Sequence, residues 1–489
     1  MAMNEKSENH DLFNDPLFLD SLMKVFRRMG NPAGEINTTH TDNMDIYWGK
    51  TDIFHPMLDF VRNTAYVTVQ LSTRKAMTPL PHIIGSDRSI NVANSDTFSE
   101  MGLSQYKMVT GALARWEPQY VKSFLDGDNI IDLGKLFHEI VSVYKSYVYF
   151  EDKDTYPFIA LWVMGTYLFP LFPAYPMILL NGPHNSGKSR TLFVSALLAF
   201  NSEVVGDPTG ATLFRMVDRF RSSLFFDDTE WLAGNKATRV ASLLKVSYKR
   251  GVIIPRVGKN TDGSVTSYEI YSPKMFTNIS GIENVLGSRT ITVHQRRKPA
   301  GYPIEKSDPK NDDSIWARLR HQLYLFTFNY WGEINALLPA QNKTPLENRD
   351  YELYAGILAI ASLIEKRTDI KGLHKKILAM ALRQSDERKS DDRVFNPSII
   401  AIQALFTLVQ KDGWYSIQQI MDAFKDCHVS NKGINEESTA GILKGLNIGK
   451  RPGTKKRFRV GSNRKRLTHY LITKKEIGIL VKRYDVDVD

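Results

Sequence analysis

Residues 182–189 read Gly-Pro-His-Asn-Ser-Gly-Lys-Ser, which is a complete instance of the pattern G-x-x-x-x-G-K-[ST]. Glycines at both ends let the backbone curl so that successive N–H groups point at bound phosphates. Lys188 then reaches the terminal phosphates, and the Ser189 hydroxyl coordinates magnesium. The pattern therefore predicts a site for ATP and Mg²⁺, with nucleotide contacts from Gly182, Pro183, His184, Asn185, Ser186, Gly187, Lys188, Ser189 and Arg190.

The segments that flank this loop are of the required kind. Residues 176–180 (PMILL) form a short apolar run typical of a buried parallel strand, and residues 189–200 (SRTLFVSALLAF) have the apolar spacing of a packed helix. The alternation of strands and helices continues to residue 300 and predicts an α/β nucleotide-binding core.

Composition sets broad limits on the protein. A chain of 489 residues with 42% hydrophobic content is long enough for roughly three domains. Its single cysteine, Cys427, excludes an internal disulfide framework and a cysteine-based zinc site, and with no signal peptide at the N-terminus we expect a cytoplasmic protein. Residues 158–180 carry no charge, but Pro170, Pro173 and Pro176 interrupt them, so we expect no membrane partner.

The organisation along the chain predicts four parts. Residues 1–127 form a mixed accessory or oligomerisation domain, with disorder at 1–15, a helix at 16–29 and a strand at 65–72. Residues 128–310 form the ATPase core, and 311–390 form a helical lid. A polar hinge at 384–393 leads to the last domain, residues 394–489.

A second acidic segment completes the predicted site. Residues 223–226 (SLFF) form an apolar strand that ends in Asp227 and Asp228, as a Walker B strand does. Asp227 would hold magnesium through its water shell, and Asp228 would polarise the attacking water. Because glutamate is usual at the second position, either the water is held differently, Glu230 contributes, or hydrolysis is slow.

The segments that follow predict a β-hairpin over residues 252–271 with a basic tip, then a strand that ends near Asn278, then Ser288 and Arg289. In this order, the chain resembles the AAA+ ATPases of the minichromosome-maintenance-like kind, especially replication helicases of phages, plasmids and other mobile elements. The resemblance covers residues 129–480. It implies a pre-sensor-1 hairpin that contacts DNA in a ring channel.

The resemblance also implies roles for single residues. Asn278 matches sensor 1, Arg289 matches the arginine finger that reaches the neighbouring subunit's triphosphate, and Arg349 looks like the lid arginine called sensor 2. An arginine from another chain couples hydrolysis to assembly. Each assignment has a competing one: Asn278 as a turn residue, Arg296 and Arg297 in place of Arg289, and Arg318 and Arg320 in place of Arg349.

The C-terminal residues predict a winged-helix domain, with helices at 397–410, 416–425 and 435–446 and strands at 457–460 and 466–473. Residues 450–475 contain eleven lysines and arginines and no acidic residue, which equals the net charge of +11. We expect Phe458 and Tyr470 to pack in the core or wing rather than stack on bases. The predicted DNA contacts are Arg256, Lys259, Lys450, Arg451, Lys455, Lys456, Arg457, Arg464 and Lys465.

Together these features favour an ATP-dependent DNA helicase or translocase that works as a ring, by family resemblance a hexamer, in replication of a mobile element. Its expected partners are single-stranded or forked DNA, further copies of itself and other replication proteins. Two alternatives have nearly the same sequence pattern: an AAA+ helicase loader or remodeller, and a DNA-binding initiator or regulator in which ATP acts as an assembly switch.

Overall fold

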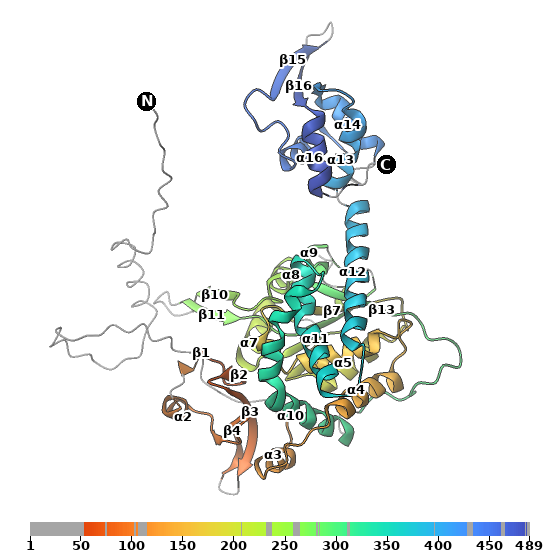
Figure 1. The fold of residues 1–489 in the computed structure, drawn as a ribbon. Helices are drawn as coiled ribbons and strands as arrows, with labels where there is room; N and C mark the ends of the chain where they lie inside the picture. The colour runs from red at the N-terminus through yellow and green to blue at the C-terminus, as the bar shows by residue number, and fades with distance from the viewer. Residues whose placement is uncertain are drawn as a thin grey trace, which may run out of the picture. The chain divides into compact units, whose positions relative to one another are not determined.

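The computed structural model describes residues 53–73, 76–101, 104–105, 115–206, 208–230, 237–257, 265–279, 282, 284–310, 313–395, 397–427, 434–460, 465–484 and 486. The chain divides into two compact units, residues 1–378 and 379–489 (Figure 1). The predicted disordered segment 1–15 and helix 16–29 lie outside the described residues.

A five-stranded parallel sheet forms the centre of the first unit, in the order β13-β7-β12-β9-β8. The three central strands are buried almost throughout, as expected for a sheet covered on both faces, and two of them, β7 and β9, are largely apolar. The strands are β7 (Met177–Asn181), β8 (Ser202–Val205), β9 (Ser223–Phe226), β12 (Lys274–Asn278) and β13 (Thr290–His294). This parallel α/β arrangement is compatible with a P-loop core.

Helices pack around this sheet. The amphipathic helix α4 begins after its N-cap, Asp132, and the almost entirely apolar α5 is buried along its length. The described helices between residues 118 and 367 are α3 (Pro118–Leu125), α4 (Leu133–Tyr147), α5 (Thr155–Gly165), α6 (Lys188–Leu198), α7 (Gly210–Phe220), α8 (Ala237–Val246), α9 (Asn284–Gly287), α10 (Ser314–Leu337) and α11 (Asn348–Arg367), with 3-10 turns at Phe169–Leu171 and Pro339–Lys343.

The uncharged stretch 158–180 is divided as its prolines predict. It contains most of α5, the 3-10 turn Phe169–Leu171 and most of β7, all packed into the core. Among the described helices, none combines the length and apolarity that are needed to cross a bilayer.

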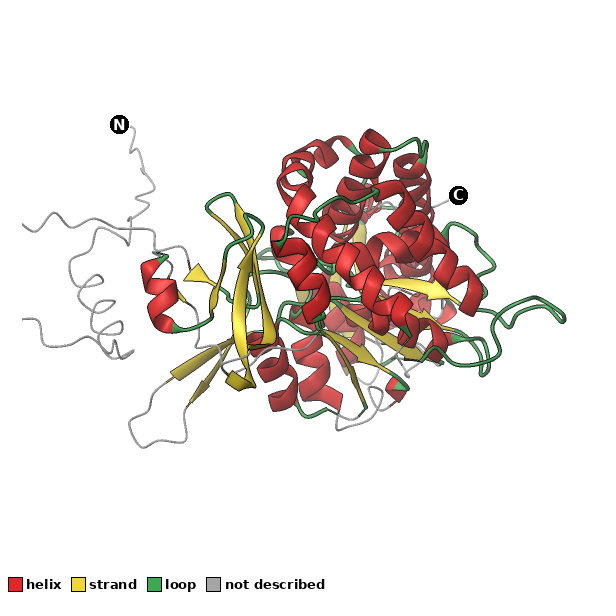
Figure 2. Ribbon diagram, turned by 90° about the horizontal axis from the view of Figure 1, so that it is seen from below, coloured by secondary structure: helices red, strands yellow, loops and turns green. Residues whose placement is uncertain are grey.

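The N-terminal part of this unit is an antiparallel sheet in the order β2-β3-β4-β5, a separate group of strands beside the helix-rich part (Figure 2). The predicted strand 65–72 corresponds to β3 (Thr64–Thr73). Its neighbour β4 (Ala76–Gly85) was not predicted from the sequence. Pro79 and Pro81 lie within this strand, and proline normally argues against a central strand. The other elements here are β1 (Ile53–Phe54), β2 (Leu58–Val61), β5 (Ile90–Val92), α2 (Ser95–Glu100) and β6 (Ser104–Gln105).

The polar hinge predicted at 384–393 is wrong. These residues lie inside one continuous helix, α12 (Leu373–Phe395). Glutamine, glutamate, lysine and arginine are good helix formers, so polarity without glycine or proline does not mark a loop.

The described part of the second unit contains most of α12 (Leu373–Phe395), three further helices, a small sheet and a last helix. Its sheet is antiparallel, in the order β14-β16-β15, and its core includes Ile402, Phe424, Leu443, Tyr470 and Leu480. Its elements are α13 (Pro397–Leu408), β14 (Gly413–Ser416), α14 (Ile417–Asp426), α15 (Glu436–Gly445), β15 (Lys455–Val460), β16 (Lys465–Ile472) and α16 (Lys474–Tyr484).

Candidate nucleotide site

The predicted site segments meet at one edge of the parallel sheet. The glycine-rich loop follows β7, the two aspartates follow β9, and Asn278 is the last residue of β12. Because β12 lies between β7 and β9 and all three run parallel, their carboxyl ends are neighbours. Ligands of open α/β sheets bind at this edge.

Two glycines give the loop its shape. Gly187, immediately before α6, has φ of +92°, which favours glycine. At Gly182 a Cβ atom would lie 2.0 Å from the carbonyl oxygen of Gln295. The backbone N–H of Gln295 donates to Asn181 (2.7 Å), and its side-chain amide donates to Thr191 on α6 (2.8 Å). Gln295, the residue after β13, therefore holds the loop at both ends, and its close approach explains why residue 182 is glycine.

Lys188 lies within the curl of this loop. Its Nζ donates to the carbonyl oxygens of Gly182 (2.7 Å) and Pro183 (2.9 Å). The pKa of Lys188 is lowered from its usual value, because burial disfavours the charged ammonium group. The nearby carboxylates of Glu230, Asp227 and Asp228 act in the opposite direction but are the smaller effect. The ammonium group is thus positioned beside the acidic side of the site.

The residues predicted to hold magnesium are in contact. Ser189 Oγ donates to Asp227 Oδ1 (3.0 Å), and Thr277 Oγ1 donates to the same oxygen (2.7 Å). Thr277 also accepts from the backbone N–H of Asp228 (2.7 Å), so it fixes the turn after β9. Hydroxyl and carboxylate oxygens are ligands that Mg²⁺ prefers. Serine and aspartate thus form the oxygen donor set that a magnesium–triphosphate ligand needs.

The three other polar groups at this edge differ in their surroundings. Asp228 is exposed and has φ of +57°, an uncommon value for a residue with a side chain. Glu230 is held: its Oε2 accepts from Asn278 Nδ2 (2.5 Å) and its Oε1 from the backbone N–H of Ile279 (2.7 Å). Asn278 is therefore tied to the acidic turn and not only to its own strand end.

These groups line one cavity of about 780 Å³, which is within the usual size range of small-molecule sites. Among the described residues that line this cavity, Ser186 Oγ and Asn278 Oδ1 are buried without a hydrogen-bond partner. Unsatisfied buried groups at such an edge, with a loop that has no room for a Cβ at Gly182, fit a phosphate-bearing ligand with a bound cation. The lining residues are His184, Asn185, Ser186, Gly187, Lys188, Ser189, Arg190, Asp227, Asp228, Glu230, Thr277, Asn278, Ile279 and Asp308.

Two of the predicted nucleotide contacts are bound to other parts of the chain. The guanidinium of Arg190 donates to the carbonyl of Glu305 (2.7 Å) and to Asp308 Oδ1 (2.8 Å), so it holds the segment after β13 at the cavity rim. The carbonyl of His184 accepts from Arg297 Nε (3.0 Å). Of these two residues, Arg190 thus has its guanidinium engaged by the segment after β13, whereas His184 is held through its backbone carbonyl.

The predicted finger and lid arginines lie together at the other edge of the sheet. Arg289 immediately precedes β13, whose first residue, Thr290, pairs with Met177 at the start of β7. The guanidinium carbons of Arg289 and Arg349 lie 5.7 and 5.3 Å from the centre of the Tyr248 ring, within the range of cation–π contacts. Both groups also donate to Ser288 Oγ, at 3.3 and 3.4 Å.

This pair cannot serve the cavity of its own chain. In the register of β13 and β7, Arg289 lies level with Pro176, six residues before Gly182. At about 3.3 Å per residue, the length of β7 separates them by roughly 20 Å. No arginine side chain spans that distance.

The competing arginines have other partners. Arg296 pairs with Glu151 (3.0 Å), and Arg318 pairs with Glu139 (2.8 Å). Arg320 donates to the carbonyl of Arg115 and to the carbonyl of Leu197, and the second of these lies at the C-terminal end of α6. A cation there satisfies free carbonyls and complements the helix dipole, which is a structural task.

The predicted hairpin is present as β10 (Ile253–Val257) paired with β11 (Val265–Glu269), and its tip, with Lys259, lies outside the described residues. One face packs on α7, where the rings of Phe214 and Tyr268 are 4.6 Å apart. Arg256 lies over Phe214 (5.1 Å) and is only partly exposed. Val257, next to the tip, is 72% exposed.

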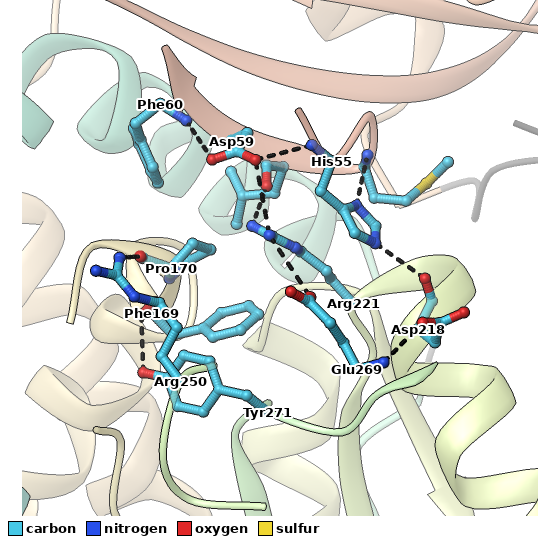
Figure 3. A network of polar contacts seen from close by, with 12 residues as sticks. His55, Asp59, Phe60, Phe169, Pro170, Asp218, Arg221, Arg250, Glu269 and Tyr271 are labelled. Carbon is cyan, nitrogen blue, oxygen red and sulfur yellow. Dashed lines mark hydrogen bonds and ion pairs between the residues drawn. The ribbon is translucent and has the colours of Figure 1, made fainter. Parts of the chain in front are cut away.

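A polar network ties the base of this hairpin to the N-terminal sheet (Figure 3). Arg221 pairs with Asp59 of β2 (3.7 Å) and with Glu269, the last residue of β11 (3.8 Å). His55 Nε2 donates to the carbonyl of Asp218, whose carboxylate accepts from the N–H of Glu269 (2.7 Å). The network thus joins β2, the end of α7 and β11, elements far apart in sequence.

The described residues among the predicted DNA contacts of the second unit lie on or beside the β15–β16 hairpin. Lys450, Arg451, Lys455, Lys456 and Arg457 are exposed. Lys465 begins β16, and Arg464 lies outside the described residues. Arg451 is 3.9 Å from Glu476. The structure therefore spreads these cations over both faces of a hairpin.

Sequence reasoning missed Thr277, Gln295 and Tyr248. A threonine one residue before Asn278 was the available signal for the first. Gln295 contacts Thr191, and Tyr248 contacts Arg289. The two residues of each pair are more than 40 positions apart in the sequence, so no local pattern predicts these contacts.

No protein-family model matches the chain, and no curated protein matches it. Among solved structures, one described as the SCCmec type IV Cch active helicase aligns with 84% of this chain and 94% of that chain, at 12% identity and a TM-score of 0.37. A TM-score this low does not establish a shared fold.

Proposed function

We propose that this protein is an ATP-dependent DNA helicase or translocase with an AAA+ core and a winged-helix domain, which acts as a ring in DNA replication. The observation that carries the proposal is the separation of two sets of groups on one sheet. The phosphate loop and acidic residues occupy the carboxyl edge, whereas Arg289 and Arg349 converge on Tyr248 at the amino edge.

This separation makes sense if the arginine pair serves another copy. Each copy would supply a nucleotide cavity to one neighbour and an arginine pair to the other, which is a head-to-tail interface. Head-to-tail interfaces that close generate rings. A planar cation supplied across the interface stabilises charge on the transferring phosphoryl group and makes hydrolysis depend on assembly.

In the proposed site, Lys188 and the loop N–H groups hold the triphosphate, and Ser189 and Asp227 hold Mg²⁺, which neutralises phosphate charge. Asp228 takes the proton of the attacking water because it is exposed to the cavity. Glu230 positions Asn278 through their hydrogen bond. The hairpin, whose strands β10 and β11 pack on α7, contacts DNA in the channel.

The decisive experiment combines forked DNA, ATP and the full chain, with strand displacement and particle shape as readouts. We expect displacement by ring-shaped particles and none with Lys188→Ala. ATP turnover without displacement, until another protein is added, would favour the helicase-loader alternative. Absence of ATP turnover would overturn the proposal.

A further inference from the structure

We propose that the outer face of the sheet β14-β16-β15 is a stacking platform for the unpaired bases of a single-stranded nucleic acid. It is formed by Trp414, Phe458 and His469, with Leu467 and Leu471 beside them. The inference deepens the proposed function, because it assigns single-stranded DNA to a surface otherwise expected only to grip phosphates.

The sheet register separates an inner from an outer face. Paired residues of adjacent strands share a face, and successive residues alternate. Tyr470 and Ile472 point into the core and are 2% and 0% exposed, as expected for Tyr470 from the sequence. Residues of β16 that alternate with these two therefore lie on the opposite face, and they are Leu467, His469 and Leu471.

Three rings gather on that outer face. Trp414 pairs with Leu471, Phe458 with Leu467, and Lys456 with His469. The Phe458 ring lies 5.3 Å from Trp414 and 4.9 Å from His469, edge to face in both cases. Phe458 is 39% exposed, and Trp414 and His469 are only partly buried. Phe458 thus packs on the outer face of the β15–β16 hairpin and not in the core, which is one of the two placements expected from the sequence.

Charge identifies the occupant. Lys456 Nζ lies 5.5 Å from the centre of the Trp414 ring, and residues 450–475 contain no acidic side chain. An aromatic surface that carries a lysine, on a basic hairpin without acidic side chains, suits a ligand with apolar rings on a polyanionic backbone, which describes unpaired nucleotides. Duplex DNA would present phosphates but keep its base faces stacked, so it would use the cations and leave the rings uncovered.

The platform is tested with the full chain in the absence of ATP, using a fluorescent 15-nucleotide thymidine strand and an abasic strand of equal length. We expect Phe458→Ala to weaken binding of the thymidine strand by roughly 5- to 150-fold and to leave the abasic strand unaffected. Phe406→Ala is the matched control, because Phe406 is exposed in the same unit but lies on α13. It should change neither affinity.

Trp414 gives a local readout, because it is the only tryptophan in residues 379–489. The thymidine strand should quench the tryptophan emission, and Trp414→Phe should remove most of that change. The platform would be overturned if Phe458→Ala lost affinity for the thymidine strand and the abasic strand equally. It would also be overturned if the variant lost affinity for neither strand. A change in the sedimentation coefficient of Phe458→Ala without DNA would overturn it as well, and would assign the face to a second copy. If the chain binds the thymidine strand more tightly than the abasic strand but does not unwind DNA, the stacking platform is supported and the proposed helicase activity is refuted.

Discussion

Asn278 donates a hydrogen bond of 2.5 Å to Glu230, across the carboxyl edge of the parallel sheet. The contact joins the last residue of β12 to the turn after β9. It also engages one carboxylate oxygen of Glu230, while Ile279 engages the other. Of the acidic residues after β9, Asp228 is therefore the one whose carboxylate is most open to the cavity.

This arrangement predicts different effects for two isosteric changes. Asp228→Asn should lower ATP turnover by about 10²- to 10⁴-fold, because it removes the general base. Glu230→Gln should lower it only about five- to tenfold, because one of the two donors would then face an amide NH₂ in place of an oxygen. Steady-state hydrolysis with saturating ATP measures both. The reverse order of effects would make Glu230 the base.

The position of Arg289 predicts complementation between copies. Arg289→Ala and Lys188→Ala should each hydrolyse ATP poorly when alone. Mixed, they should regain turnover, because some interfaces then combine an intact Lys188 with the neighbour's intact Arg289. Hydrolysis is measured across mixing ratios at fixed total protein. If the mixture gives only the weighted mean of the separate rates, Arg289 does not act across an interface.

Tyr248 should act through its ring and not through its hydroxyl. Tyr248→Phe keeps the surface on which Arg289 and Arg349 lie and loses only a 3.3 Å hydrogen bond to Glu352, so turnover should stay within about twofold. Tyr248→Ala should lower turnover at high protein concentration by about tenfold, with ATP affinity unchanged. Parallel measurements of hydrolysis and nucleotide binding separate the two effects. Equal behaviour of the variants would show that the ring does not position the arginines.

The close approach of Gln295 predicts that Gly182→Ala disrupts the loop. The added methyl would lie 2.0 Å from a carbonyl oxygen, so the backbone must shift. A strain of about 1–3 kcal/mol corresponds to a roughly 5- to 150-fold loss of ATP affinity. Gly206→Ala is the control, because no atom lies within 4 Å of a Cβ there, and it should bind ATP normally. Normal binding by Gly182→Ala would contradict the bracing role of Gln295.

His321 predicts loss of stability in mild acid. The indole of Trp116 donates to His321 Nδ1 (3.1 Å), which requires a neutral ring, and burial lowers the pKa of His321. The folded state therefore binds fewer protons than the unfolded state as pH falls below about 6.5, and stability drops by up to about 1.4 kcal/mol per pH unit.

Urea midpoints from tryptophan emission, compared between pH 7.5 and 5.0, measure this drop. His321→Gln should reduce the pH dependence, whereas His138→Gln, at an exposed position, should keep it. An unchanged pH dependence in His321→Gln would exclude this residue as its source.

How far the sequence predicts the site depends on how local each signal is. The loop 182–189, the strand before it and the aspartates after β9 are contiguous patterns, because backbone conformation and phosphate binding act over a few residues. The same holds for β3, for the hairpin strands and for the helices of residues 397–446. Proline hid β4, and polar composition hid the continuity of α12.

By itself, the sequence determined that a triphosphate-type loop sits between a buried strand and a helix, and that cations concentrate near the C-terminus. Only the tertiary structure decided that Glu230 is bound to Asn278, that Arg289 and Arg349 share Tyr248 at the edge away from their own loop, and that Phe458 faces outward. Strand order and register determine which distant residues meet and which face of a sheet a side chain occupies. Neither property can be predicted from the composition of a short segment.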